Sequence, residues 1–88
     1  MRVRRKPGVT SETVDGEAVL IGPDAKEVIA VNAVGTLVWE ALASPRDTDD
    51  LVDELLGTFD DVGRDELQRD VRGFLSELRE ADLIEEID

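Results

Sequence analysis

Residues 27–42 read EVIAVNAVGTLVWEAL, and the change of pattern inside this stretch decides how the chain is expected to fold. After Glu27 the first residues are all apolar and rich in β-branched side chains, which favours a strand. Asn32 is a preferred helix N-cap, and apolar residues then recur at helical spacing as far as Leu42. The stretch therefore predicts a strand over 27–31 that passes directly into a helix over 32–43.

The expected helix carries the only tryptophan of the chain, Trp39, away from its apolar stripe and next to Gly35 one turn earlier. We interpret Trp39 as a large residue that closes a gap in a small core and leaves its indole N–H near the surface. Gly35 would then allow a neighbouring backbone to come close. The predicted stripe consists of Val34, Leu37, Val38, Ala41 and Leu42.

Two further strands are predicted before residue 27, over 9–14 and 17–22. The Asp15-Gly16 pair between them favours a hairpin, and the residues from Pro23 onward favour a short turn. Strands joined this closely form an antiparallel meander, with 9–14 and 27–31 at its edges. The 27–31 strand is apolar on both faces, so either a helix of the same chain covers it or its edge accepts an extended peptide as a fourth strand.

The rest of the chain reads as helical. A second helix is expected from Asp47 or Thr48, and a third over 64–81 with a continuous apolar stripe. Residues 83–87 are expected to pack as a short extension. The order of elements predicts an α+β fold, a three-stranded antiparallel sheet followed by three helices, in a single domain over 1–88. Residues 1–8 hold four cations and are expected to form a flexible basic arm.

Composition argues against several functions. The formal net charge of −12 disfavours nucleic-acid binding. The chain has no cysteine and no histidine, so the usual nucleophile, imidazole base and zinc ligands are missing. Its carboxylates form no catalytic constellation. We expect no enzyme activity, no metal and no cofactor, and a cytoplasmic protein without a membrane span.

Segments along the whole chain, in order and spacing, resemble the PqqD-like family. The chain departs from the family pattern at Asp82, where the family often has Gly, and at Val31, where it often has Leu. The segments that carry the resemblance are Lys6-Pro7-Gly8-Val9, Gly16-Glu17-Ala18-Val19-Leu20, Val31-Asn32-Ala33-Val34-Gly35 with Trp39, Asp70-Val71 with Phe74-Leu75 and Leu78, and Ala81-Asp82-Leu83-Ile84.

The resemblance implies a winged-helix-like domain that binds the leader of a ribosomally made precursor peptide, laid antiparallel along the 27–31 strand beside the third helix. It implies delivery of that peptide to a leader peptidase, a cyclase or a radical SAM enzyme. The pathway implied is a lasso-peptide pathway, with pyrroloquinoline quinone or other radical SAM pathways as alternatives. The residues that would bind the peptide are Glu27, Val28, Ile29, Ala30, Val31, Leu67, Asp70, Val71, Phe74 and Leu78.

Two points stay open at the level of the sequence. The groove could be lined by the flank of the third helix that holds Leu67, Asp70 and Phe74, which we favour, or by that of Gln68, Arg72 and Leu75. The expected state is a monomer that binds one peptide. The alternatives are a winged-helix DNA-binding protein and a structural subunit that pairs with itself through the open sheet edge.

Overall fold

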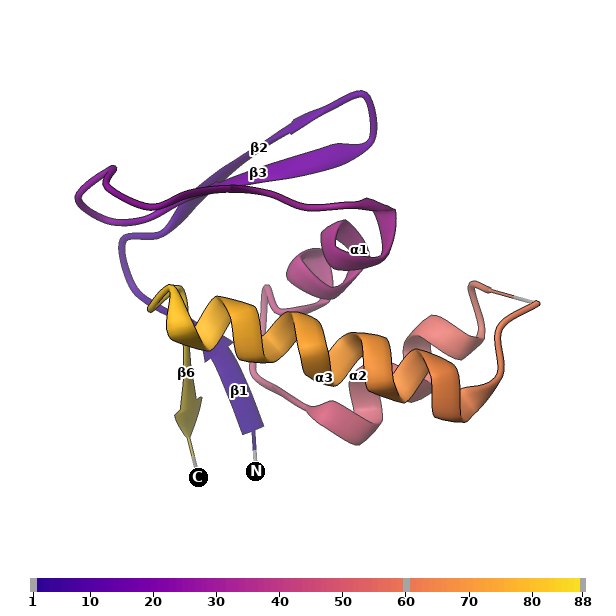
Figure 1. Cartoon of the computed structure of the whole chain (residues 1–88). Helices are drawn as coiled ribbons and strands as arrows, with labels where there is room; N and C mark the ends of the chain where they lie inside the picture. Colours follow the sequence, from indigo (N-terminus) through magenta and orange to yellow (C-terminus); the bar gives the residue numbers. More distant parts are fainter. Residues whose placement is uncertain (1, 60, 88) are drawn as a thin grey trace.

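The computed structural model describes residues 2–59 and 61–87, which form two small antiparallel sheets and three helices (Figure 1). The α+β class and the three helices are confirmed, and the winged-helix comparison describes the arrangement only loosely. In chain order the elements are β1 Arg2–Arg5, β2 Thr10–Val14, β3 Glu17–Ile21, β4 Val28–Ala30, α1 Ala33–Ala41, β5 Arg46–Asp47, α2 Thr48–Leu56, α3 Arg64–Glu80 and β6 Ile84–Ile87.

The first sheet is the expected meander, in the order β2-β3-β4. Asp15 and Gly16 both adopt positive φ, 54° and 81°, which matches the twist of a two-residue hairpin turn. Ala18 and Leu20 of β3 turn inward and are buried, whereas every residue of β2 is exposed. One face of this sheet therefore packs on the core, while β2 and β4 form its two edges.

The second sheet, in the order β5-β1-β6, corrects the expectation of a flexible basic arm. Residues Arg2–Arg5 pair along their length with Ile84–Ile87, and Val3 is only 3% exposed. Arg4 donates to the Glu85 carboxylate at 2.6 Å. The basic strand β1 thus pairs with the acidic strand β6, which forms where the sequence predicted only a short extension.

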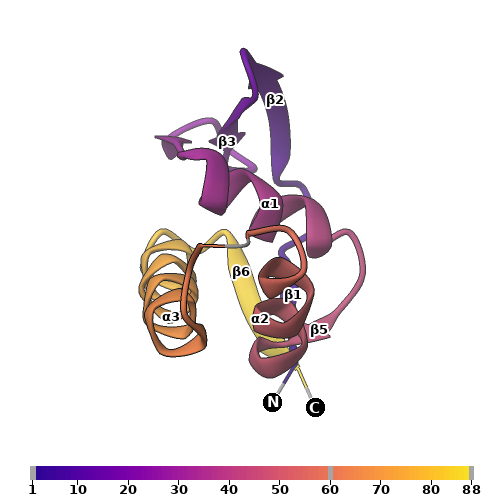
Figure 2. The ribbon, with the colours of Figure 1, turned by 90° about the vertical axis from the view of Figure 1, so that its right-hand side faces the viewer.

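Helix α1 lies between the first sheet and the pair formed by α2 and α3 (Figure 2), and this position changes which of its residues are buried. Gly35, Val38 and Trp39 are buried, whereas Val34 and Leu37 of the predicted stripe are only half-buried. A helix in contact on two sides buries more than one stripe. Trp39, expected off the stripe, is therefore part of the core.

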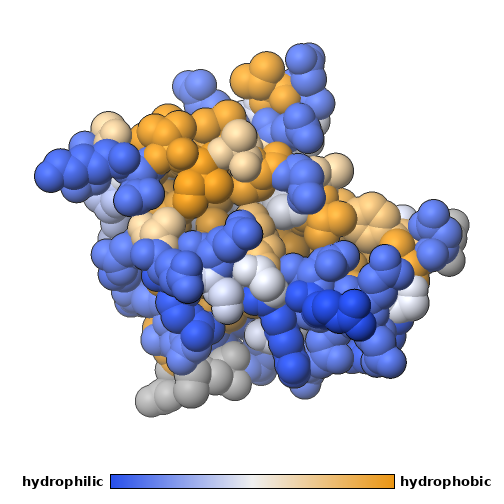
Figure 3. Space-filling model, viewed as in Figure 1, coloured by the Kyte–Doolittle hydropathy of each residue, from blue (hydrophilic) through white to orange (hydrophobic). Residues whose placement is uncertain are grey.

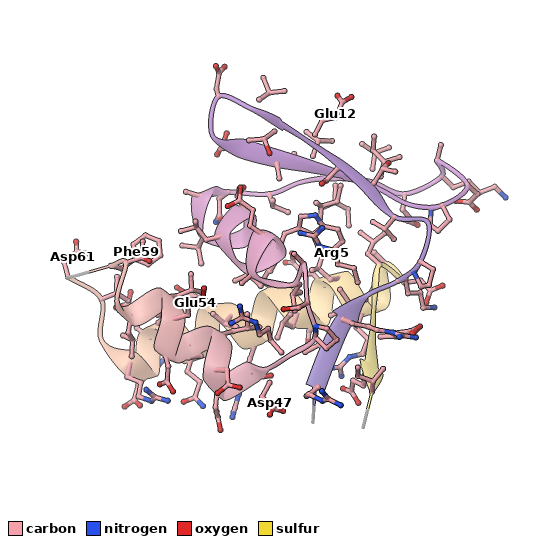
Figure 4. The ribbon with its side chains drawn as sticks, turned by 180° about the vertical axis from the view of Figure 1, so that it is seen from behind. Arg5, Glu12, Asp47, Glu54, Phe59 and Asp61 are labelled. Carbon is pink, nitrogen blue, oxygen red and sulfur yellow. The ribbon has the colours of Figure 1, made fainter. Side chains whose placement is uncertain are left out.

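Trp39 is 2% exposed, and its Nε1 is buried without a partner among the described residues, so the expectation of an N–H near the surface is wrong. The Arg5 guanidinium covers the indole ring 4.4 Å from its centroid and its Nε donates to the Trp39 carbonyl oxygen at 3.1 Å (Figure 4). Burial lowers the pKa of Arg5, an effect that the charge of Glu40 opposes. Arg5 therefore links β1 to α1.

Helix α3 ends where the sequence predicted, in a turn that explains why glycine is common at the position of Asp82. Asp82 has φ of 64°, and the Leu83 N–H donates to the Leu78 carbonyl oxygen at 2.9 Å while the Asp82 N–H donates to that of Arg79 at 3.0 Å. This pair of bonds defines a Schellman turn, whose left-handed residue is usually glycine. Within the described ranges, no helix is long and apolar enough to cross a membrane.

Candidate functional site

The open edge of β4 is the first part of the candidate site. Within the described residues β4 pairs with β3 alone, so its second edge has no strand beside it. Val28 is 61% exposed and Ala30 is also exposed, whereas Ile29 lies opposite the buried Leu20 and is half-buried. One face of β4 is therefore covered by the core, and its outer face and its edge are not.

The register shows which backbone groups point out of this edge. The Val31 N–H donates to the Ala18 carbonyl oxygen at 3.0 Å, and the Gly22 N–H donates to that of Glu27 at 2.8 Å. Hydrogen-bonded and non-bonded pairs alternate along an antiparallel ladder. The strand therefore turns the backbone groups of Glu27, Ile29 and Val31 toward β3, and those of Val28 and Ala30 toward the open edge.

A hollow of about 360 Å³ lies between the start of α1 and the middle of α3, and we call it the helix hollow. Gly35 is what brings its walls together: a Cβ at this position would lie 2.9 Å from Cε1 of Phe74 and 3.0 Å from the Val31 Cβ. Gly35 thus accommodates an aromatic side chain, where the sequence suggested a backbone. The hollow is lined by Asn32, Val34, Gly35, Arg69, Asp70, Gly73, Phe74 and Glu77.

A second hollow of about 450 Å³ lies at the other end of β4, between the β3–β4 turn and the end of α3, and we call it the turn hollow. Glu80 of α3 and its C-cap residue Ala81 follow Glu77 of the helix hollow at helical spacing. The same flank of α3 therefore runs past both hollows. The turn hollow is lined by Gly22, Pro23, Asp24, Lys26, Glu27, Glu80, Ala81 and Asp82.

We call the surface formed by the open edge of β4, the two hollows and this flank of α3 the β4–α3 groove. In the space-filling view, apolar surface gathers above, over the first sheet, and hydrophilic surface covers most of the lower half (Figure 3). The groove thus offers unpaired backbone groups beside an apolar sheet and a largely charged helix flank.

The structure brings together some of the expected site residues and separates others. Asp70 and Phe74 line the helix hollow, and Glu27 lines the turn hollow. Leu67, Val71 and Leu78 have exposed fractions of 1%, 0% and 0%, so they hold α3 against the core from behind the groove. Of the alternative flank, Leu75 is buried and Arg72 faces the start of α2.

Several groove residues are absent from the set expected from the sequence, among them Asn32, Gly35, Arg69, Gly73, Glu77 and Glu80. Gly73 and Glu77 could have been predicted from Asp70 and Phe74, because residues three and four apart share one face of a helix. Burial lowers the pKa of Arg5, and the hydrogen bond to Asp53 raises the pKa of Arg64. Neither residue lines the groove. The described residues contain no cluster of side chains suited to a metal ion.

Three comparisons bear on this geometry. The family model described as coenzyme PQQ synthesis protein D (PqqD) matches residues 17–84. A solved structure described as TbiB1 in complex with the TbiA(beta) leader peptide is similar with a TM-score of 0.84 and 27% identity, over 97% of this chain and 98% of that chain. A second, described as lasso peptide synthetase B1 complexed with the leader peptide, has a TM-score of 0.79 and 20% identity, over 96% and 98%. No curated protein matches the chain.

Proposed function

We propose that this chain, which belongs to the PqqD family, binds the leader region of a ribosomally made precursor peptide and delivers it to a maturation enzyme. The observation that carries the proposal is the unpaired edge of β4 beside the α3 flank. The structure of the 27% identical relative, described as a complex with a leader peptide, supports it.

The proposed mode of binding is strand addition. An extended peptide, antiparallel to β4, would bond to the N–H and carbonyl groups of Val28 and Ala30, which extends the sheet by one strand. Side chains of the peptide that alternate toward α3 would enter the helix hollow beside Phe74 and Asp70. Main-chain bonds would supply affinity for any extended peptide, and the hollows would supply specificity.

The chain would perform no chemistry of its own. Its partners would be the precursor and an enzyme that acts on it, a leader peptidase, a cyclase or a radical SAM enzyme. Because the precursor is made on ribosomes, we expect the complex to form in the cytoplasm. A lasso-peptide pathway is proposed first, with pyrroloquinoline quinone and other radical SAM pathways as alternatives, and the genes beside this one test the choice. Genes for a peptidase and an asparagine-synthetase-like cyclase would support the first, and a radical SAM gene the others.

Proline substitution tests strand addition. Ala30→Pro removes an N–H that points out of the sheet, a position where edge strands tolerate proline. We expect the variant to stay folded and to lose binding of the TbiA(beta) leader, used as a probe, by about tenfold or more in calorimetric titration. Proline at Ile29 is unsuitable, because its N–H points toward β3.

Two matched variants serve as controls. Ala30→Val enlarges the same side chain and keeps the N–H, and Ser11→Pro removes an outward N–H from the opposite edge of the same sheet, since Glu12 and Thr10 pair with the β3 residues that turn toward β2. Both should bind the probe as the unaltered chain does. Normal binding by a folded Ala30→Pro variant would rule out pairing at β4.

A further inference from the structure

The turn hollow differs from the helix hollow in its charge. Four carboxylates, those of Asp24, Glu27, Glu80 and Asp82, line the turn hollow against a single cation, Lys26. The helix hollow has two carboxylates, Asp70 and Glu77, against one cation, Arg69, beside the apolar walls of Val34 and Phe74. The two ends of the β4–α3 groove therefore present different chemistry to anything that lies along β4.

Part of the negative charge in the turn hollow is not neutralised within the described part of the chain. The Asp82 carboxylate pairs with the Lys6 ammonium, and an Asp24 oxygen accepts the Lys26 backbone N–H at 3.1 Å. Neither Glu27 nor Glu80 takes part in an ion pair with a described residue, and both are exposed. The Lys6 ammonium thus already binds one carboxylate of the turn hollow, that of Asp82. The carboxylates of Glu27 and Glu80 are available to another cation.

The direction of β4 relates the two hollows to the sequence of a bound peptide. Strand β4 leaves Glu27 at the turn hollow and reaches Asn32 at the helix hollow. An antiparallel peptide would pass the helix hollow first and the turn hollow last. At about 3.3 Å per residue, the two positions lie roughly 17 Å apart. Both hollows lie on the α3 side of β4, and side chains on one face of an extended peptide recur at every second residue, so the two side chains would be about four or six residues apart.

We propose that the groove selects a basic peptide, with a Lys or Arg side chain in the turn hollow about four or six residues C-terminal to the side chain that enters the helix hollow. This inference rests on the proposed function, because the open edge of β4 makes the site and the carboxylates only select the charge of its occupant. Charge complementarity of this kind contributes mainly to specificity and to the rate of association.

The whole chain is acidic, so a basic peptide would also be attracted without any specific site. The test must therefore separate the local carboxylates from the overall field. The double variant Glu27→Gln/Glu80→Gln removes two charges at the turn hollow. The control Glu12→Gln/Glu40→Gln removes the same number outside both hollows, with Glu12 on the exposed strand β2 (Figure 4).

The experiment begins with a display library of random peptides, selected against the unaltered chain and against its Ala30→Pro variant. Peptides that require the open edge are expected to carry Lys or Arg at one position, about four or six residues after an enriched apolar position. For the peptide most enriched, Glu27→Gln/Glu80→Gln should weaken binding by about threefold to tenfold, and the control pair by less than about twofold. Replacing the basic residue of the peptide by Gln should abolish the difference between the two pairs.

The outcomes separate this inference from the function on which it rests. Peptides that need the open edge but show no basic preference, or that lose equal affinity in both double variants, would overturn the inference and leave strand addition intact. If no peptide is enriched, or if the enriched peptides bind Ala30→Pro normally, the proposed function fails and this inference with it.

Discussion

Gly35 shows how a single residue sets the shape of the groove. A glycine inside a helix costs about 1 kcal/mol relative to alanine. Here the missing Cβ lets the Phe74 ring and Val31 approach to distances that a side chain would forbid, 2.9 and 3.0 Å from the Cβ position. The wall of the helix hollow thus depends on a residue that weakens α1. The opposing contact comes from α3, far away in the sequence, so no local pattern could reveal it.

Asp82 is a second residue whose role is conformational. Its φ of 64° is costly for a residue with a Cβ, and its carboxylate also pairs with Lys6. Asp82→Gly and Asp82→Ala both remove that ion pair, so their difference isolates the backbone effect. We expect the free energy of unfolding to be about 1–2 kcal/mol higher for Asp82→Gly than for Asp82→Ala, measured by urea titration. Equal stabilities would mean that the turn does not impose this strain.

At the scale of the element, α3 serves the core with one face and the groove with the neighbouring face. Leu67, Val71 and Leu78 are buried, and Asp70, Gly73, Phe74 and Glu77 line the helix hollow. Gly73 is notable because a Cβ there would meet nothing of the described chain within 4 Å. A glycine in a helix interior with open space before it leaves room for a ligand to approach closely.

Gly73→Ala should therefore separate stability from binding. We expect the free energy of unfolding to rise by about 0.5–1 kcal/mol, because alanine is the better helix former. The added methyl group projects into the helix hollow and should weaken peptide binding by about fivefold or more. Ser76→Ala, on an exposed part of α3 outside the hollow, should raise stability by up to about 0.5 kcal/mol and leave binding unchanged. Unchanged binding in Gly73→Ala would place the peptide elsewhere.

The elements that could be predicted were those with local signals. The Asp15-Gly16 turn, the Asn32 cap and the apolar stripe of α3 each lie within a few residues of what they determine, and each is confirmed. The strand β1 could not be predicted, because its partner β6 begins more than seventy residues later and only the pairing buries Val3.

The lining of the candidate site could likewise be predicted only in part. The strand edge at Val28 and Ala30 was visible as an apolar run without protective charges. On α3, however, the apolar stripe that stands out in a sequence is the buried one, so Leu67, Val71 and Leu78 were expected in the groove. The residues beside that stripe, polar or glycine, face the hollow and leave a much weaker signal.

At the scale of the whole molecule, the chain ends hold the domain together while the middle of the chain presents its open edge. Strands β1 and β6 pair in the second sheet, and Arg5 at the end of β1 packs on the ring of Trp39 in α1. Trp39 is buried and lines neither hollow, so its fluorescence is a poor reporter of binding. Calorimetry or a labelled peptide suits the measurement better.

The open edge also predicts an oligomeric state. Val28 is 61% exposed, and the free edge of β4 is short, since the strand spans only Val28–Ala30. Short edges pair poorly with themselves, and a net charge of −12 adds repulsion between copies. We expect a monomer at micromolar concentration by analytical sedimentation, with one peptide bound per chain. A stable dimer without peptide would favour the self-pairing alternative.

Amide hydrogen exchange followed by NMR shows whether a bound peptide joins the first sheet at β4. Without peptide, the Val28 and Ala30 amides should exchange rapidly, and those of Ile29 and Val31, which point toward β3, should be protected. A saturating leader peptide should protect Val28 and Ala30 as well, and leave the exposed edge of β2 unchanged. Peptide binding that leaves the Val28 and Ala30 amides in rapid exchange would contradict strand addition.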